Sequence, residues 1–591
     1  MTPRHTVVAC LLLATIPCGA PFAASADAPA DVVVMGARVY TLEPAQPSAE
    51  AIALRGDRIV KVGSSDDVRA LVRAGQTRVI EAKGGLVLPG FIDNHTHFDQ
   101  AGRLLLGLNL LEVDEPVAFR KQVAEAAGRL PAGAWLVGGD WGAYGAWAKG
   151  STGAEAAAGA ARPPEFLPAK ELIDPVTGDH PALVSRFDGQ LHLANSLALR
   201  AAGITAATPP PEGGEIVKGK DGAPNGLLRG TAAQLVRKAI PPPAYAQRKA
   251  EALRALAEAR KYGVTTIHDN VPDFDGLQLF RDLQKSGELT SRVWARMWLS
   301  EWEKERDYIR EKGLAAVSGG WGDDMIRLGG LKAWVDGIMG NSSALFFEPY
   351  TNAPGQYGRL RPVMFPEGNL YRLVRDADRA GFTVTVHAIG DRANRILLDT
   401  YERVFAENPP RDRRFRVVHA QVMDPDDQRR FGRLGLVAEV QPYHAIDDMR
   451  WMEERIGERA KNAYAFRGLL NGGAAMSFGS DWPGTNASYY PINPLLGIYA
   501  AVTRQTLDGK PEGGWFPRQR ISLEDAVRFF TWNNAYVTFE EDTKGSLKEG
   551  KLADIAVLDR DIFSRPPREL VDTQVLYTIL GGKVVKAPDA P

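Results

Sequence analysis

The stretch "GGLVLPGFIDNHTHFD", residues 84–99, is an apolar strand that ends in a polar segment with two histidines. Side chains two positions apart on a strand point the same way, so His95 and His97 are expected side by side. Two imidazoles together make a poor hydrophobic core, but imidazole is a common metal ligand. The stretch therefore predicts a metal site at the carboxyl end of this strand.

The composition limits the possible functions. The chain has 591 residues, a formal net charge of -1 and 45% hydrophobic residues. This length allows one large domain with additions, or two or three smaller domains. The balanced charge argues against general binding of nucleic acid or acidic membranes, because no basic excess is available to hold phosphates.

Residues 1–26 have the organisation of a secretory signal peptide. Arg4 supplies a positive charge, residues 7–16 form a short apolar run, and Ala24-Ser25-Ala26 is a small-residue cleavage site. We expect cleavage after Ala26 and a periplasmic or secreted protein without membrane attachment. An uncleaved anchor is the alternative, disfavoured because the run is shorter than an ordinary membrane span.

Both cysteines, Cys10 and Cys18, lie inside this segment. The residues before Cys18 do not match a lipoprotein box. The mature chain is therefore expected to lack disulfides, thiolate nucleophiles and cysteine-ligated metals. Any metal must be held by histidines, carboxylates or a rarer ligand.

Eight apolar segments in the middle of the chain are predicted strands, and helical patterns lie between many of them. The segments cover residues 86–93, 264–269, 293–299, 326–335, 383–387, 415–419, 436–441 and 475–481. Eight β/α units predict an α/β fold with a (β/α)8 TIM-like barrel, whose chemistry lies at the carboxyl ends of its strands. An open doubly wound sheet is the alternative.

Two further regions complete the expected domain organisation. Short β-rich segments at residues 27–85 and 536–591 predict one β module, split between the two ends around a barrel at 86–535. About 170 residues separate the first two barrel strands, far more than an ordinary connection. We therefore expect a folded insertion at about 102–243. We interpret it as a cap over the barrel mouth, with a purely structural excursion as the alternative.

Six side chains fall at or near the ends of the predicted strands. They are His95, His97, Lys332, His387, His419 and Asp481. Imidazole and carboxylate ligands suit Zn, Mn, Fe or Co, and this set exceeds what one catalytic zinc needs. Two metals require a bridging ligand, which Lys332 supplies only if it is carbamylated. A simple ion pair between Lys332 and Asp336 or a surface carboxylate is the alternative.

Six motifs in order along the chain resemble those of the amidohydrolase superfamily. They are "GFIDNHTHFD", "KAWVDG", "VHAIGD", "VVHAQ", "FGSDWP" and the tail "GSLKEGKLADIAVLD". The most similar group is the amidohydrolase-3 type, which includes N-substituted formamide deformylase-like proteins. The resemblance implies a (β/α)8 barrel with a composite β-sandwich. It also implies that the six side chains, with Lys332 as a carbamate, hold one or two divalent ions, with zinc favoured.

Two segments depart from the group. Residues 336–344 read "DGIMGNSSA" where relatives read "DGSLGSRTA", and Gln190 stands where relatives often have a histidine, with His192 nearby. We expect these segments to face substrate. Trp141, in the insertion, is a further candidate substrate contact because aromatic side chains suit an apolar substrate portion.

The resulting hypothesis is a metal-dependent hydrolase that cleaves a linear or cyclic amide of a small molecule. Asp481 is the expected general acid and base, and His444 is expected to stabilise an oxyanion or bind substrate. His268 is a candidate residue near the metals or substrate, but a buried structural histidine paired with Asp269 is the favoured interpretation. Arg416 and Arg467 have solvated surface positions as their default interpretation. The alternatives are a deaminase, a phosphoester, ester or lactone hydrolase, or a non-catalytic periplasmic binding protein. A homodimer is left open.

Overall fold

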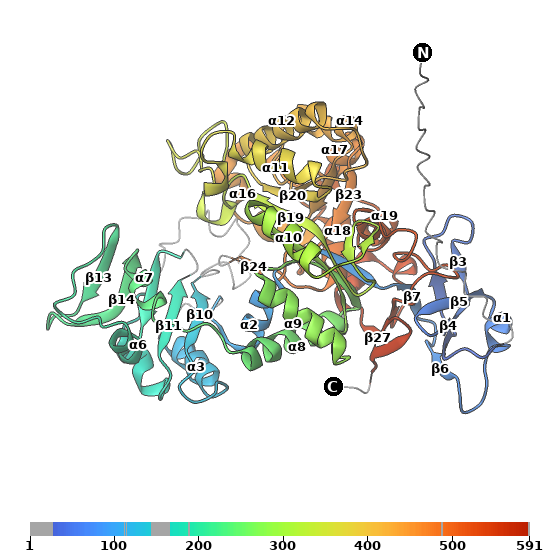
Figure 1. Cartoon of the computed structure of the whole chain (residues 1–591), viewed down its shortest axis with the longest axis horizontal. Helices are drawn as coiled ribbons and strands as arrows, with labels where there is room; N and C mark the ends of the chain where they lie inside the picture. Colours follow the sequence, from blue (N-terminus) through green and yellow to red (C-terminus); the bar gives the residue numbers. More distant parts are fainter. Residues whose placement is uncertain are drawn as a thin grey trace, which may run out of the picture.

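The computed structural model describes residues 28–111, 113, 115–142, 166–186, 189–485 and 488–588. The expected signal peptide lies outside these ranges. A barrel occupies the centre of the molecule, a sheet from the insertion lies to its left in Figure 1, and the N-terminal β-rich region lies to its right. None of the helices in these ranges combines the length and hydrophobicity that crossing a membrane requires.

Eight parallel strands form the central barrel and pair in chain order. They are β8 (Phe91–Thr96), β15 (Val264–Asn270), β16 (Arg292–Trp298), β19 (Ile326–Trp334), β20 (Thr383–Ala388), β21 (Arg416–His419), β22 (Val437–Val440) and β23 (Ala475–Phe478). The predicted (β/α)8 barrel is therefore confirmed, and the open doubly wound alternative is wrong.

Side-chain and backbone bonds close the barrel between its first and last strands. Asn94 Nδ2 donates to Ser477 Oγ at 2.5 Å, and Asp481 N donates to His95 O at 2.9 Å. A further backbone bridge joins Thr96 to Trp482. These bonds place the polar ends of β8 and β23 next to each other.

Amphipathic helices cover the outside of the barrel. They include α8 (Tyr245–Lys261), α9 (Phe274–Lys285), α10 (Trp302–Glu311), α11 (Asn369–Arg379), α12 (Asp391–Glu407), α17 (Phe466–Asn471) and α19 (Leu523–Phe529). In α11 the buried apolar residues are Leu370, Leu373, Val374 and Ala377. This spacing of three and four residues gives one apolar stripe, which packs on the sheet.

The single strand predicted at residues 86–93 is wrong. The structure has two strands there, β7 (Leu86–Pro89) and β8, in two different sheets. They are separated by Gly90, where an added Cβ would lie 2.2 Å from Thr265 Oγ1. The Pro89-Gly90 pair is the sequence signal for this break, and the close approach to β15 explains why a glycine stands there.

Both ends of the chain build one β-rich unit. One sheet has the order β5-β4-β1-β6, and a second has the order β28-β27-β26-β7-β2-β3. The strands are β1 (Val32–Met35), β2 (Arg38–Tyr40), β3 (Ser48–Ala49), β4 (Ala51–Arg55), β5 (Arg58–Gly63), β6 (Arg78–Glu81), β26 (Ile555–Leu558), β27 (Val575–Leu580) and β28 (Lys583–Lys586). Buried residues of the two sheets, such as Ile52, Ile80, Val87 and Val557, share one core.

The insertion leaves the barrel through a helix pair. Helix α2 (Phe98–Leu106) packs on α8 so closely that a Cβ on Gly102 would lie 2.3 Å from Glu251 O. The sheet beyond it has the order β13-β14-β12-β11-β10-β9. Its strands are β9 (Leu108–Asn109), β10 (Leu136–Trp141), β11 (Ala182–Arg186), β12 (Leu191–Ala194), β13 (Gly214–Lys218) and β14 (Pro224–Gly230). The insertion therefore has its own sheet and core.

The tail motif "GKLAD" joins the terminal β unit to the amino end of the barrel. The carboxylate of Asp554 accepts from Arg292 Nε at 2.7 Å and from Nη2 at 2.9 Å, and both side chains are buried. A bidentate, buried pair of this kind fixes direction as well as distance. The pair holds the amino end of β16 against the start of β26.

Candidate metal centre

Seven of the predicted site side chains line one cavity at the carboxyl ends of the barrel strands. They are His95, His97, Lys332, His387, His419, His444 and Asp481. The cavity has a volume of about 200 Å³. The strands bring these residues together because parallel strands of a barrel all end at the same rim.

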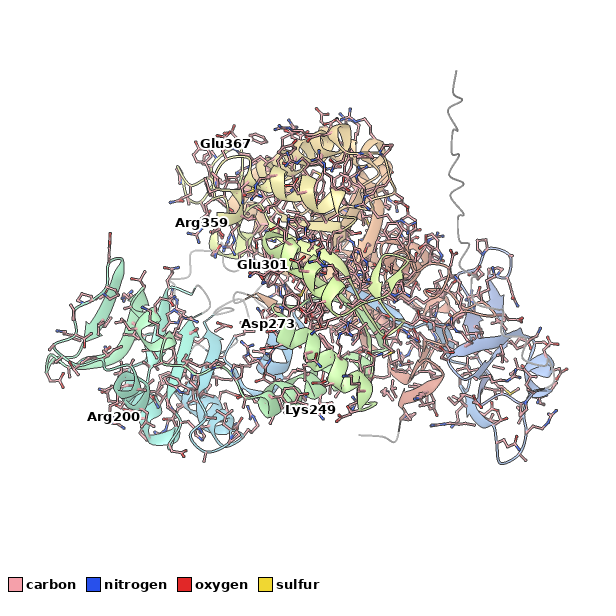
Figure 2. The ribbon with its side chains drawn as sticks, viewed as in Figure 1. Arg200, Lys249, Asp273, Glu301, Arg359 and Glu367 are labelled. Atoms are coloured by element: carbon pink, nitrogen blue, oxygen red, sulfur yellow. The ribbon has the colours of Figure 1, made fainter. Side chains whose placement is uncertain are left out.

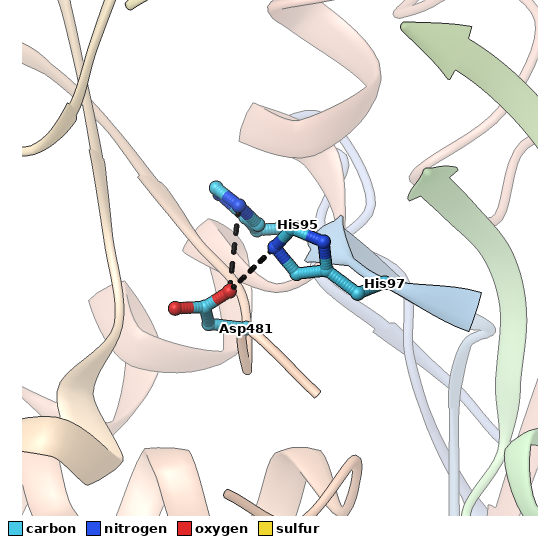
Figure 3. Close-up of side chains that lie close together, drawn as sticks. All are labelled: His95, His97 and Asp481. Carbon is cyan, nitrogen blue, oxygen red and sulfur yellow. Dashed lines mark ion pairs between the residues drawn. The ribbon is translucent and has the colours of Figure 1, made fainter. Parts of the chain in front are cut away.

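Asp481 lies at the centre of this group (Figure 3). Its Oδ1 is 3.4 Å from His95 Nε2 and 3.3 Å from His97 Nε2. Its other oxygen, Oδ2, is 3.8 Å from His444 Nε2. Asp481 therefore belongs to two sets of donor atoms that are each close enough to bind one ion, with His95 and His97 in one set and with His419 and His444 in the other.

Lys332 lies on the floor of the cavity, where β19 ends. Its Nζ is 3.3 Å from His95 Nε2, and its side chain is buried. Burial, together with the charge of Arg296, lowers the pKa of the Lys332 ammonium to about 7. The neutral amine is therefore well populated near neutral pH.

The ion pair considered for Lys332 is not present in the described part of the chain. Asp336 instead accepts hydrogen bonds from three backbone amides, at 2.8 Å from Leu345 N, 3.1 Å from Ile389 N and 3.0 Å from Gly390 N. Its carboxylate is thus used to hold the loop after β19. This leaves the Lys332 amine directed at the histidines.

Outer hydrogen bonds orient three of the imidazoles. His95 Nδ1 lies 2.8 Å from Glu439 Oε1, His419 Nδ1 lies 2.7 Å from Gln441 Oε1, and His387 Nε2 lies 3.0 Å from Gly337 O. Each acceptor holds the proton on one ring nitrogen and leaves the lone pair of the other for a metal. Burial also lowers the pKa of His95 and His419 well below the ordinary value. The donor set therefore fits a divalent ion.

Two of these residues have an unusual backbone. His419 has φ 72° and Asp481 has φ 60°, in the left-handed region that residues other than glycine rarely adopt. Each such residue costs about 1–3 kcal/mol and persists only when its surroundings impose it. For Asp481, the bonds from its amide to His95 O and from Gly484 N to its carbonyl hold this conformation.

Glu439 is the main feature that the sequence analysis did not identify. It lies in β22, is 0% exposed, and accepts from Arg296 Nη1 at 2.7 Å and from Arg416 Nη1 at 2.9 Å, besides its bond with His95. Burial raises the pKa of Glu439, but Arg296 and His95 outweigh it and hold that pKa well below its ordinary value. A glutamate inside the apolar segment "LVAEV" is the only sequence signal for this role.

The surface position assumed for Arg416 is wrong. Arg416 is fully buried, with its guanidinium 4.3 Å from the centre of the Trp294 ring and paired with Glu439. It begins a strand whose side chains alternate, so it points into the barrel. Arg467 is half-buried on α17 and donates to Arg520 O at 3.0 Å.

His444 completes the cavity on the side of Asp481. Its ring stacks on Tyr490 with 3.7 Å between the ring centres. Burial, opposed by Asp481, lowers the pKa of His444 to about 4. Its Nε2 is buried without a hydrogen-bond partner among the described residues. The lone pair of this free ring nitrogen can bind an ion or accept a hydrogen bond from a substrate.

The structure places the other four predicted residues outside this cavity. Trp141 is buried in the core of the insertion, 5.8 Å from the Phe119 ring, Gln190 is exposed, and His192 lies in β12 beside Ser185. His268 is buried inside the barrel, 3.2 Å from Arg416 Nη1. No described residue of the insertion lines the cavity.

The fold and the cavity together define the class of protein. A closed parallel barrel carries histidines, an aspartate and a lysine at the carboxyl ends of its strands, and these donors fit divalent ions. This is the arrangement of a metal-dependent (β/α)8-barrel hydrolase.

Comparison with known proteins identifies the family. The model of the amidohydrolase family matches residues 78–586. The chain is 36% identical to the protein LONG AFTER FAR-RED 3 of Arabidopsis thaliana, over 94% of this chain and 91% of the relative. It is 26% identical to N-substituted formamide deformylase of Arthrobacter pascens, over 93% and 97%. The chain therefore belongs to the amidohydrolase family, the hydrolases of carbon–nitrogen bonds other than peptide bonds.

A solved structure supports the same fold. An uncharacterized metal-dependent hydrolase from Pyrococcus horikoshii superposes with a TM-score of 0.71 and 22% identity, over 91% of this chain and 99% of that chain. At 22% identity, this similarity supports the fold alone. It agrees with the barrel seen in the chain itself.

The Glu439 cluster makes a first prediction. Glu439→Gln keeps the shape of the side chain but removes the charge that orients His95, so we expect metal affinity to fall about 10- to 100-fold. Two buried guanidiniums also lose their counter-charge, so stability should fall by about 3–5 kcal/mol. Metal titration against a competing chelator and thermal unfolding measure the two effects.

A second buried glutamate provides the control. Glu540 pairs with Arg327 at 3.2 Å and with Lys544 at 2.9 Å, and it does not line the cavity. Glu540→Gln should therefore lower stability while metal affinity stays at the wild-type value. Equal metal affinity in Glu439→Gln and wild type would contradict the orienting role.

Proposed function

We propose that the chain hydrolyses the carbon–nitrogen bond of a small amide, with Asp481 transferring the proton. The observation that carries the proposal is the position of Asp481. One of its oxygens faces His95 and His97 and the other faces His444, inside one small cavity. Similarity to N-substituted formamide deformylase over almost the whole of both chains favours an amide substrate.

The proposed metal ligands are His95, His97, Lys332 as a carbamate, His387, His419 and Asp481. We propose one or two divalent ions, with zinc favoured because histidine and carboxylate ligands suit it. A bound ion supplies Lewis acidity, which activates water and polarises the substrate carbonyl.

Carbamylation of Lys332 has a physical basis in its burial. The neutral amine adds to carbon dioxide, one N–C bond forms, and one proton leaves. The product is a carboxylate, which replaces a buried cation beside the ions with an anionic ligand. The lowered pKa of Lys332 favours this reaction because only the unprotonated amine is nucleophilic.

Asp481 moves the proton in the proposed reaction. Its carboxylate accepts the proton of the attacking water and returns it to the leaving nitrogen, so the products are a carboxylic acid and an amine. His444, kept neutral by its low pKa, lines the cavity beside Asp481 and is the proposed contact to the substrate there.

The role of Asp481 makes a second prediction. Asp481→Asn keeps a ligand oxygen but cannot accept the proton, so kcat for a panel of N-substituted formamides should fall about 10²- to 10⁴-fold. Metal content should remain near wild type. Formate release and metal analysis measure the two quantities, with the exposed Asp66→Asn as the control. An active Asp481→Asn enzyme with normal metal content would refute the proton-transfer role.

The bridging role of Lys332 makes a third prediction. Lys332→Ala should lower the number of ions bound per chain, because it removes the carboxylate that the carbamate supplies. Short-chain carboxylates should restore part of the lost metal content, whereas bicarbonate should not. The exposed Lys304→Ala is the control. Unchanged metal stoichiometry in Lys332→Ala would contradict the bridging role.

We also propose that the chain is exported through its N-terminal leader. The proposal rests on the charge, apolar run and small-residue site of residues 1–26. Sequencing of the mature protein should begin at Asp27. A protein that keeps Met1 in the fraction where it accumulates would argue for an anchor or for no export.

A further inference from the structure

The rim of the cavity carries one charged side chain that the proposed reaction does not use, Arg361. We propose that the substrate bears a carboxylate group that binds to Arg361, so that the enzyme acts on N-acyl or N-formyl compounds with an acidic group near the scissile bond. This inference rests on the proposed amide hydrolysis and deepens it. Arg361 lines the same cavity as His95, Lys332 and Asp481.

The backbone of Arg361 has a fixed position at the cavity. Its amide donates to Val335 O at 2.9 Å, and the preceding Leu360 forms a backbone bridge with Asp336. Asp336 is itself held by three backbone amides. The backbone of Arg361 is thus held next to the end of β19, the strand that carries Lys332. These backbone bonds fix the position of Arg361 relative to the end of that strand.

The guanidinium of Arg361 has no ion pair or side-chain hydrogen bond with any residue that the structure describes. Other arginines of the barrel differ in this respect. Arg292 pairs with Asp554, and Arg296 and Arg416 pair with Glu439. A guanidinium is always charged and presents a planar fork of donors that matches a carboxylate. At the mouth of a substrate cavity, this fork is available to a ligand.

None of the carboxylates that line the cavity forms an ion pair with Arg361. Asp336 is engaged by backbone amides, and Asp481 lies among the histidines. Asp448 accepts from Tyr464 Oη and from Gln421 Nε2, the latter at 2.9 Å. Burial, together with the charge of Asp447, raises the pKa of Asp448 to about 8, so it is mostly protonated at neutral pH. Arg361 is therefore a cation at the cavity without a paired carboxylate among the described residues.

The remaining walls indicate the rest of the ligand. Trp334, Ile338, Met339 and Trp451 are apolar or aromatic and line the same cavity. The volume of about 200 Å³ is small, so a group at Arg361 and a bond at the histidines belong to one small molecule. Apolar walls with one fixed cation favour an amide that carries a hydrocarbon side chain and a carboxylate.

Arg359 supplies a matched control. It lies two residues before Arg361 on the same exposed segment, and Figure 2 labels it there. It also has no ion pair with a described residue, but it does not line the cavity. The two arginines thus share charge, exposure and surroundings in sequence, and they differ in access to the substrate.

The test uses matched pairs of N-formyl amino acids and their primary amides, with glycine, leucine and phenylalanine side chains. Each pair differs only in a carboxylate against a neutral carboxamide. We measure kcat/KM by formate release with the metal-loaded enzyme, and binding by calorimetry with the Asp481→Asn variant. A charge-assisted, bidentate contact should favour the acid about 10- to 100-fold in both measurements.

Three variants assign the preference to Arg361. Arg361→Gln should abolish the preference for the acid, chiefly by raising KM for the acid. Arg361→Lys keeps the charge but loses the fork, so it should retain part of the preference. Arg359→Gln should behave as wild type.

The outcomes separate this inference from the proposed function. Acid-selective binding that needs Arg361, without any hydrolysis, would support the inference and refute the proposed amide hydrolysis. Hydrolysis of acid and amide at equal rates would support the proposed function and overturn the inference. Absence of acid-selective binding in every pair, or a preference that survives Arg361→Gln, would also overturn the inference.

Discussion

The carboxylate of Glu439 is the constraint on which the site depends. It lies at the centre of the barrel and contacts side chains from three other strands: His95 of β8, Arg296 of β16 and Arg416 of β21. A buried carboxylate without partners is very unfavourable, and so are two buried guanidiniums. Because each group satisfies the others, the cluster has one arrangement, and that arrangement directs the His95 ring towards the cavity.

The same cluster sets the electrostatics of the cavity floor. Arg296 contributes to the lowered pKa of Lys332, and it also opposes the protonation of His95. Burial, assisted by the positive charge of Arg296, therefore lowers the pKa of both side chains and favours their unprotonated forms. Neutral imidazoles and a neutral amine are the forms that can bind a metal ion or carbon dioxide. The barrel interior thus affects the protonation of the candidate donors as well as their orientation.

The rim and the floor of the cavity have different structural origins. Ligands on the floor come from strand ends, and the strand ladder fixes their spacing. The rim comes from the segment between Asp336 and Arg361 and from residues around Trp451, where the chain has no regular secondary structure or only short helices. Such segments vary easily without disturbing the barrel. The candidate metal donors therefore belong to the strand ends, whereas the walls of the rim belong to the loops.

The sequence by itself determined the barrel and most of the candidate metal donors. Apolar strands of similar length, several of which end in a histidine or an aspartate, are local patterns, and parallel strands necessarily end at one rim. The sequence did not determine what depends on contacts between distant residues. His95 and Glu439 lie 344 residues apart. The Pro89-Gly90 pair marks a break locally, but the approach of β15 that requires a glycine there is a contact between distant residues. Arg416 stands in a predicted strand and Arg361 in a predicted loop, but only the structure shows that one is buried against Glu439 and that the other lines the cavity. Tertiary structure alone decided this, because burial and charge pairing are properties of the packed chain.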